Sequence, residues 1–182
     1  MKTLFILPGL NTTKISVLNW DFNLIEEVET NSPQEENIKT FELLEKIQLE
    51  EISKIAICNG PWKFTSLRNF TILVNTLKNQ FPKIQLFQIP THKFFQAKSP
   101  DSVVFFQLNW TEVFVFEDLE ERLEEVKNLK SDKKTWIWNF RNKMQLPQNL
   151  EENLNPKKDS EIFWSFFTEE FEVEKIVPFY GK

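Results

Sequence analysis

The sequence predicts an α/β fold, and two features of the 182-residue chain lead to this prediction. Short apolar runs rich in β-branched residues occur at 3–7, 54–58 and 84–89, as expected for buried strands. Two further segments, 33–48 and 65–79, repeat their apolar residues with the period of an amphipathic helix. Strands that alternate with helices in this way are typical of a sheet on which the helices pack.

Three strands are expected before the first helix. Residues 3–7 form a continuous apolar run that Pro8-Gly9 closes, which indicates a central strand. Residues 14–20 carry alternating apolar side chains, and after a turn at Asp21 the segment 22–28 is predicted as a third strand. The N-terminal order is therefore three strands, helix, strand, helix, strand.

The first helix is predicted over residues 33–48. Ser32 is expected to cap it, with Pro33 at the first helical position and Glu35 three residues beyond the cap. Its apolar residues cover an arc of roughly 220°, about twice what one core contact requires. Part of the arc should therefore meet another surface, which could equally be a partner or a C-terminal element of this chain. The apolar residues are Ile38, Phe41, Leu43, Leu44 and Ile47.

The junction at residues 58–68 joins the fourth strand to the second helix through Asn59-Gly60-Pro61. Such a helix N-terminus is a common anion site, because its first amide groups are unpaired. A single glycine followed by Trp62 and Lys63 favours a plain βα connection over a phosphate-binding loop.

The second helix, 65–79, has an apolar stripe roughly 120° wide and an opposite side with little charge. The stripe consists of Leu67, Phe70, Leu73, Val74 and Leu77. The opposite side holds Arg68, Asn69, Thr71, Ile72, Asn75 and Thr76. Solvated faces usually carry Glu and Lys, so this side indicates contact with another surface, although Thr and Asn also face water in many helices.

The pattern of strands restarts after residue 102. A hairpin is predicted from 103–108 and 112–116, followed by a short acidic helix marked by Leu119, Leu123 and Val126. The later predictions are a strand at 135–140, a loop at 145–159, an unassigned helix or strand at 161–171 and a last strand at 173–180.

Composition limits the classes of function. With 22 basic and 27 acidic residues the net charge is -5, which argues against tight autonomous binding of nucleic acid. Only three glycines occur, which excludes a glycine-rich nucleotide loop. The N-terminal apolar segment is too short for a signal sequence, and no run approaches the ~18 residues that span a bilayer. A soluble cytoplasmic protein is expected.

Residues for catalysis or metal binding are scarce. The single cysteine, Cys58, is expected to be a buried strand residue, and the single histidine, His92, a surface or loop residue. Leu7 ends the first strand, where a phosphotransferase needs a carboxylate for magnesium. The carboxylates of residues 117–125 are predicted to line the solvated face of the acidic helix, at Glu117, Asp118, Glu120, Glu121, Glu124 and Glu125. No cofactor or metal is expected.

The segment 60–68 resembles the Gly-Pro-Gly-Ser-Phe-Thr-Gly-Leu-Arg signature of the bacterial TsaB proteins, also called YeaZ. The matching positions are Gly60, Pro61, Phe64, Thr65, Leu67 and Arg68. Weaker likenesses run along the chain. Residues 1–18 are similar to the first hairpin of the family, 107–114 to its Asp-Ala-Arg-x-x-Glu-Val-Tyr segment, and 178–180 to its terminal Pro-x-Tyr.

The resemblance implies an actin-like, RNase H-like (ASKHA) fold. Residues 1–99 would form a βββαβαβ N-terminal subdomain that carries the partner-binding helices, and residues 100–182 a shortened second α/β subdomain. It also implies a non-catalytic subunit, a pseudo-enzyme, that pairs with a TsaD-like catalytic subunit. That complex, which can include a TsaE-like ATPase, transfers threonylcarbamoyl to a tRNA adenosine next to the anticodon. The tRNA would be met only through the complex.

The two helices of the N-terminal subdomain would supply the partner interface in this family. The candidate interface residues are Ile38, Phe41, Leu44, Thr65, Arg68, Ile72 and Asn75. Trp62, Lys63 and Ser66 stand where the family has Gly, Ser and Gly, and Phe70, Val74 and Thr76 where it tends to have small residues, so the approach of the helices must be remodelled. Two alternatives remain open: a self-associating ASKHA-fold interaction protein, and a peptidase-like (M22-type) enzyme or small kinase of the same superfamily.

Overall fold

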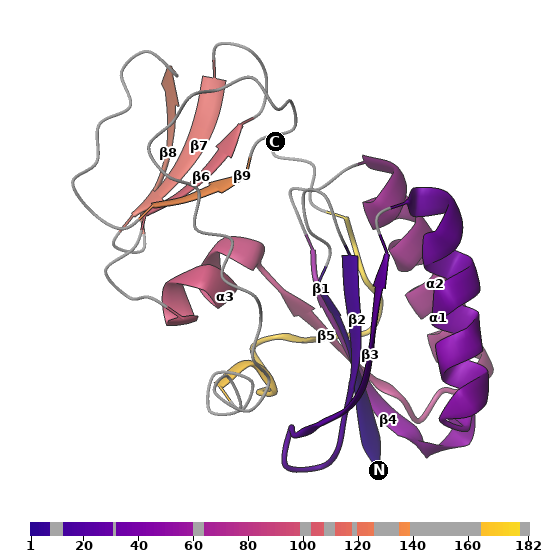
Figure 1. Cartoon of the computed structure of the whole chain (residues 1–182). Helices are drawn as coiled ribbons and strands as arrows, with labels where there is room; N and C mark the ends of the chain where they lie inside the picture. Colours follow the sequence, from indigo (N-terminus) through magenta and orange to yellow (C-terminus); the bar gives the residue numbers. More distant parts are fainter. Residues whose placement is uncertain are drawn as a thin grey trace.

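The structure is a computed structural model that describes residues 1–7, 13–30, 32–59, 64–98, 103–107, 112–117, 120–125, 135–138 and 165–178. Its larger part is a six-stranded sheet in the order β10-β5-β4-β1-β2-β3 (Figure 1). Its strands are β1 (Lys2–Leu7), β2 (Thr13–Leu18), β3 (Leu24–Thr30), β4 (Ile52–Cys58), β5 (Gln85–Ile89) and β10 (Glu172–Val173). The strands β1, β4 and β5 run parallel, whereas β2 pairs antiparallel with both β1 and β3.

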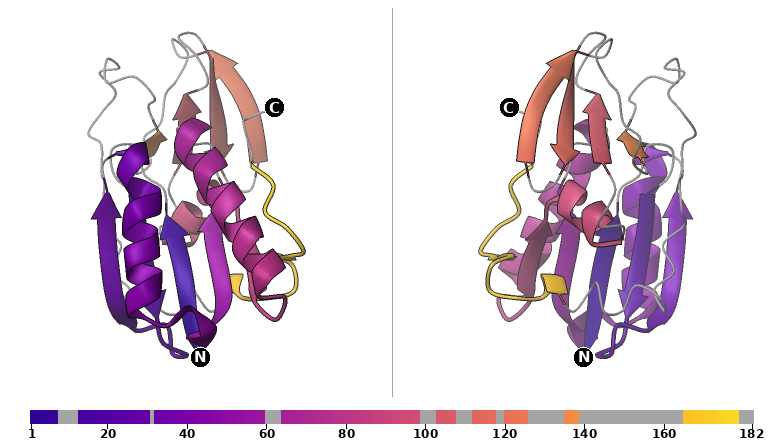
Figure 2. Two further views of the ribbon diagram at one scale, coloured as in Figure 1. Left: turned by 90° about the vertical axis from the view of Figure 1, so that its right-hand side faces the viewer. Right: turned by 90° about the vertical axis from the view of Figure 1, so that its left-hand side faces the viewer.

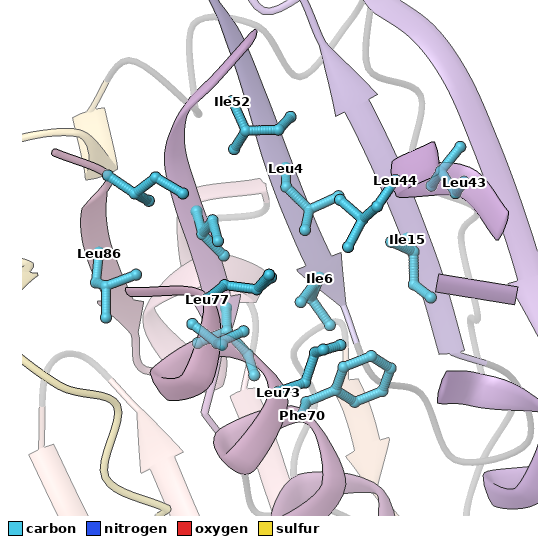
Figure 3. Close-up of a cluster of buried hydrophobic side chains, with 14 of the residues drawn as sticks. Leu4, Ile6, Ile15, Leu43, Leu44, Ile52, Phe70, Leu73, Leu77 and Leu86 are labelled. Carbon is cyan, nitrogen blue, oxygen red and sulfur yellow. The ribbon is translucent and has the colours of Figure 1, made fainter. Parts of the chain in front are cut away.

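Two helices cover one face of this sheet, α1 (Pro33–Lys46) and α2 (Phe64–Gln80), while a short turn of 3-10 helix (Leu49–Glu51) leads from α1 into β4. Figure 3 shows the core that they enclose, in which Leu4, Ile6 and Ile15 of the strands face helical side chains. The helices contribute Leu43, Leu44, Ile47, Phe70, Leu73, Val74 and Leu77 to this core. Every residue of the predicted α2 stripe is buried, which confirms the 3.6-residue period.

The opposite face of the sheet is covered by a helix that was not predicted, α3 (Thr91–Lys98). Phe94 of α3 is fully buried, with its ring 5.6 Å from that of Phe5 and 6.0 Å from that of Phe166. A second aromatic group forms where Phe22, at a backbone φ of 57°, stacks on Phe167 at 4.6 Å. Phenylalanine side chains therefore make up about half of this second core, which also holds aliphatic residues such as Leu18 and Ile89.

A second sheet has the order β8-β7-β6-β9. Its strands are β6 (Val103–Gln107), β7 (Glu112–Glu117), β8 (Glu120–Glu125) and β9 (Thr135–Trp138). The pairing of β6 with β7 is antiparallel, which confirms the predicted hairpin. The predicted acidic helix is wrong, because residues 120–125 are strand β8. Leu123 pairs there with Phe114, and Arg122 contacts Glu117 and Glu124, so pairing with β7 overrides the helix propensity of Glu-Glu-Arg-Leu-Glu-Glu.

The C-terminal segment returns to the first sheet, although the predicted boundary at 99/100 assigned it to the second subdomain. β10 pairs with β5 at Phe87 and Leu86, and Ile176 is buried between α2 and the sheet. Asn75 of α2 holds Ile176 through both backbone groups, donating to its carbonyl at 3.0 Å and accepting from its amide at 2.8 Å. The regular strand is shorter than the predicted 173–180, and residues 179 and 180 lie outside the described part, as does the predicted loop at 145–159.

Helix α1 is tied to the edge strand β3 by two lysines. Lys39 donates to the backbone carbonyl of Glu29 at 3.1 Å, and Lys46 forms an ion pair with Glu26. At the start of α1, Ser32 is the N-cap residue and Pro33 follows it, as predicted, but the Ser32 hydroxyl contacts Gln34 and makes no capping bond. The start of α1 was therefore predicted correctly, although the Ser32 side chain does not cap the helix, and α1 ends at Lys46, two residues before the predicted end.

Candidate functional site

The candidate site is the outer face of α1 and α2, which lie side by side on the sheet (Figure 2). Three large apolar side chains on this face are more than half exposed, namely Ile38 at 60%, Phe41 at 51% and Ile72 at 56%. We call these three residues, with the exposed Thr65 and Arg68, the helical face. An exposed group of large apolar residues on adjacent helices is characteristic of an interaction surface.

The spacing of residues explains this exposure. Leu43 of α1 and its C-cap residue Ile47 pack in the core. At 100° per residue, Ile38 lies on the opposite side of the helix and Phe41 on the flank towards α2. On α2, Ile72 lies on the flank towards α1. The strands that precede the two helices, β3 and β4, run in the same direction, so α1 and α2 also run in the same direction and lie side by side.

Two of the predicted interface residues are placed elsewhere. Leu44 is only 2% exposed and packs in the core, because its position on α1 faces the sheet and α2. Asn75 is half-buried, and both functional groups of its amide bond Ile176, so it holds the C-terminal segment. Neither belongs to the helical face. The broad apolar arc of α1 is thus divided between the domain's own core and an uncovered part.

The residues of the signature segment meet the site at the start of α2. Phe64 is the first residue of that helix, Leu67 is fully buried, and Thr65 and Arg68 are exposed on its first turn. The other two matching positions, Gly60 and Pro61, lie outside the described residues. The segment therefore contributes two side chains to the helical face and one to the core.

A buried carboxylate beside this site was not singled out from the sequence. Glu36, in the first turns of α1, is 2% exposed, and its Oε1 accepts hydrogen bonds from two hydroxyl groups. One is Thr13 of β2, at 2.9 Å, and the other is Ser66 of α2, at 2.7 Å. A signal was present in the sequence, since Ser66 stands where the TsaB signature that this segment resembles has a glycine. An acidic residue in the first turn of a helix is nevertheless common for electrostatic reasons alone, so it attracted no attention.

His92 is not the surface or loop residue that was predicted. It lies on α3, where its ring stacks on Phe116 of β7 with centroids 4.0 Å apart and the planes 12° from parallel. Burial, with a contribution from the charge of Lys93, lowers the pKa of His92 from 6.5 to about 4. His92 is therefore neutral near pH 7 and contributes to the contact between α3 and the second sheet.

This shift predicts a pH dependence of stability. The unfolded chain takes up a proton on His92 at a higher pH than the folded chain, so the free energy of unfolding should fall as the pH drops from 6.5 towards 4. In His92→Phe, which keeps an aromatic ring but does not titrate, this loss should be smaller by about 1 to 2 kcal/mol, allowing for solvent screening. Urea denaturation of both proteins at a series of pH values measures the difference. Parallel curves for the two proteins would contradict the prediction.

Other potentially reactive side chains of the described residues are buried or paired with neighbouring side chains. Cys58 is fully buried in β4, as predicted, and burial raises the pKa of its thiol well above the ordinary value. Glu124 and Glu117 hydrogen-bond Arg122 and raise its pKa. Within the described ranges, no three His, Cys, Asp or Glu side chains are grouped as metal ligands. No helix in that part of the chain has the length and apolar character needed to cross a bilayer.

The sequence matches no family model and no curated protein. Solved structures resemble its fold. A protein from Pseudomonas aeruginosa described as uncharacterized, with similarity to peptidase YeaZ, aligns over 100% of this chain and 99% of its own, at 14% identity and a TM-score of 0.65. YeaZ from Pseudomonas aeruginosa aligns at 14% identity and a TM-score of 0.51, over 68% of this chain and 64% of its own, which is slightly under two thirds. The chain has the α/β, actin-like fold that the resemblance implied, in a form similar to YeaZ.

Proposed function

We propose that this chain is a non-catalytic docking subunit of the TsaB type. It supports a TsaD-like catalytic partner in the transfer of threonylcarbamoyl to the tRNA adenosine next to the anticodon, and a TsaE-like ATPase is a further component of the proposed complex. The observation that carries the proposal is the helical face, where Ile38, Phe41 and Ile72 are left uncovered by the chain's own core. The similarity of the fold to YeaZ supports it.

The chemistry of the helical face suits a partner with its own apolar helices. Removing Ile38, Phe41 and Ile72 from water would supply most of the binding free energy, because buried apolar and aromatic anchors dominate protein interfaces. Thr65 and Arg68 at the start of α2 would form part of the polar rim. With a net charge of -5, the chain would meet tRNA only through the assembled complex.

The proposal predicts that two negative charges on the helical face strongly weaken binding to the partner. Phe41→Glu combined with Ile72→Glu should weaken binding to the TsaD-like protein of the same genome by about a hundredfold or more, because two carboxylates would be desolvated at the centre of the contact. Isothermal titration calorimetry measures this affinity. A control for the effect of such a substitution elsewhere is Leu123→Glu, which places one carboxylate on a side chain of similar exposure, 52%, in β8 of the second sheet.

The outcomes separate the alternatives. Binding that survives the double substitution in a folded protein would remove the helical face from the interface. A stable homodimer that the same substitution dissociates, and that does not bind the TsaD-like protein, would favour the self-associating protein. Analytical ultracentrifugation with and without the TsaD-like protein measures the oligomeric state. A metal ion or ATP bound at equimolar level would favour the peptidase-like or kinase-like enzyme.

A further inference from the structure

We infer that Glu36 is a positioning residue that fixes the relative orientation of α1 and α2, and thereby the geometry of the helical face. The inference rests on the proposed function where it concerns the partner, and on contacts of the chain alone where it concerns the helices. Its basis is the pair of hydrogen bonds that one carboxylate oxygen accepts, from Ser66 of α2 and from Thr13 of β2.

The hydrogen bond between Glu36 and Ser66 lies where it can set the orientation of α1 relative to α2. Glu36 and Ser66 lie in the first turns of α1 and α2, which start at Pro33 and Phe64 and run in the same direction. Thr65 and Arg68 flank Ser66 along α2, and Ile38 follows Glu36 on α1 after half a turn. The bond therefore joins the two helices at the end where the helical face begins.

Because the hydrogen bonds of Glu36 are buried, they can form only in one relative position of the two helices. Glu36, Ser66 and Thr13 are each at most 3% exposed, so water does not substitute readily for a lost hydroxyl donor. Hydrogen bonds to a carboxylate are short and directional, and a buried acceptor that loses its donor is costly. Apolar packing between helices tolerates sliding and rotation better than such a bond does.

The other flank of α1 is anchored independently. Lys39 and Lys46 bind the helix to Glu29 and Glu26 of β3, which restrains α1 against the sheet edge and not against α2. Loss of the Ser66 hydroxyl should therefore leave α1 on the sheet but free its α2-facing side to shift. A partner that contacts both helices at once would then meet a surface of altered shape.

The test compares two substitutions that each remove one donor to the same Oε1 atom. Ser66→Ala breaks the link between α1 and α2, whereas Thr13→Val, nearly identical in shape to threonine, breaks only the link to β2. Urea denaturation establishes whether the two variants lose similar stability. Nitroxide labels introduced through Glu45→Cys and Asn79→Cys, both exposed, report the distance between the helices by electron paramagnetic resonance, while the buried Cys58 is protected from labelling.

The expected result is a shifted or broadened distance distribution in Ser66→Ala and an unchanged one in Thr13→Val. The affinity for the TsaD-like protein should fall on the order of tenfold in Ser66→Ala alone. Ser66→Thr, which keeps a hydroxyl group, should restore both readings in part. An unchanged distribution in Ser66→Ala would overturn the inference, whatever the partner does. If Phe41→Glu with Ile72→Glu leaves binding intact, the proposed function fails while the spectroscopic result still decides the role of Glu36.

Discussion

Deletion of residues 165–182 is expected to leave a chain that no longer folds cooperatively. Phe166 and Phe171 are buried in the core beneath α3, and Ile176 in the core beneath α2, so the segment contributes to both faces of the sheet. Burial of three such side chains contributes roughly 5 to 9 kcal/mol, against about 5 to 15 kcal/mol for the total stability of a domain. The deletion should therefore abolish the sigmoidal transition in thermal and urea denaturation followed by circular dichroism.

Two single substitutions in the same segment compare the loss of a buried side chain with the loss of an exposed one. Ile176→Ala, at a side chain 2% exposed, should lower the free energy of unfolding by about 2 to 4 kcal/mol. Val177→Ala, at the next position but 52% exposed, should change it by less than about 0.5 kcal/mol. A truncated protein that unfolds cooperatively, with a midpoint near that of the full chain, would show that the C-terminal segment contributes little to the stability of the core.

The second large effect is expected from Phe94→Ala in α3. The Phe94 ring is fully buried between Phe5 of β1 and Phe166, so its removal leaves a cavity where the helix, the sheet and the C-terminal segment meet. A cost of about 3 to 5 kcal/mol is typical of such a change. Chemical denaturation measures it, and Phe94→Leu, which fills most of the volume, should cost less than half as much. Equal stability of both variants and the wild type would mean that α3 does not pack as described.

The N-terminal strands and helices could be predicted because their patterns are long and agree with one another. The helical period over α1 and α2 spans about four turns or more in each helix, and residues 55–58 of β4 are a continuous apolar run that is fully buried. The bounds of α2 were within one residue of the prediction. The burial of its stripe followed directly from the period.

Elements that depend on distant partners could not be predicted in the same way. Strand β8 has a sequence with high helix propensity and becomes a strand only because β7 offers pairing for it. Helix α3 has eight residues, too few to display a period, and its stability comes from Phe94 in the aromatic core. Local sequence carries neither piece of information.

The candidate site shows the same division. Ile38, Phe41 and Ile72 were predicted as candidate interface residues from the helical periodicity together with the resemblance to TsaB, and the structure leaves all three exposed. Leu44 was misplaced because a helical angle alone does not say how closely α2 approaches α1. The roles of Asn75 and Glu36 depend on residues 101 and 30 positions away, Ile176 and Ser66, so no local pattern reveals them.

The lysine contacts along β3 have a consequence for the protein at high concentration. A sheet that ends in a strand exposes main-chain acceptors that can recruit further strands and seed fibrils. Here the Glu29 carbonyl is already occupied by Lys39, and the strand carries Glu26, Glu27 and Glu29 in close succession. Growth of aggregates by strand addition is therefore discouraged at the β3 edge of the first sheet.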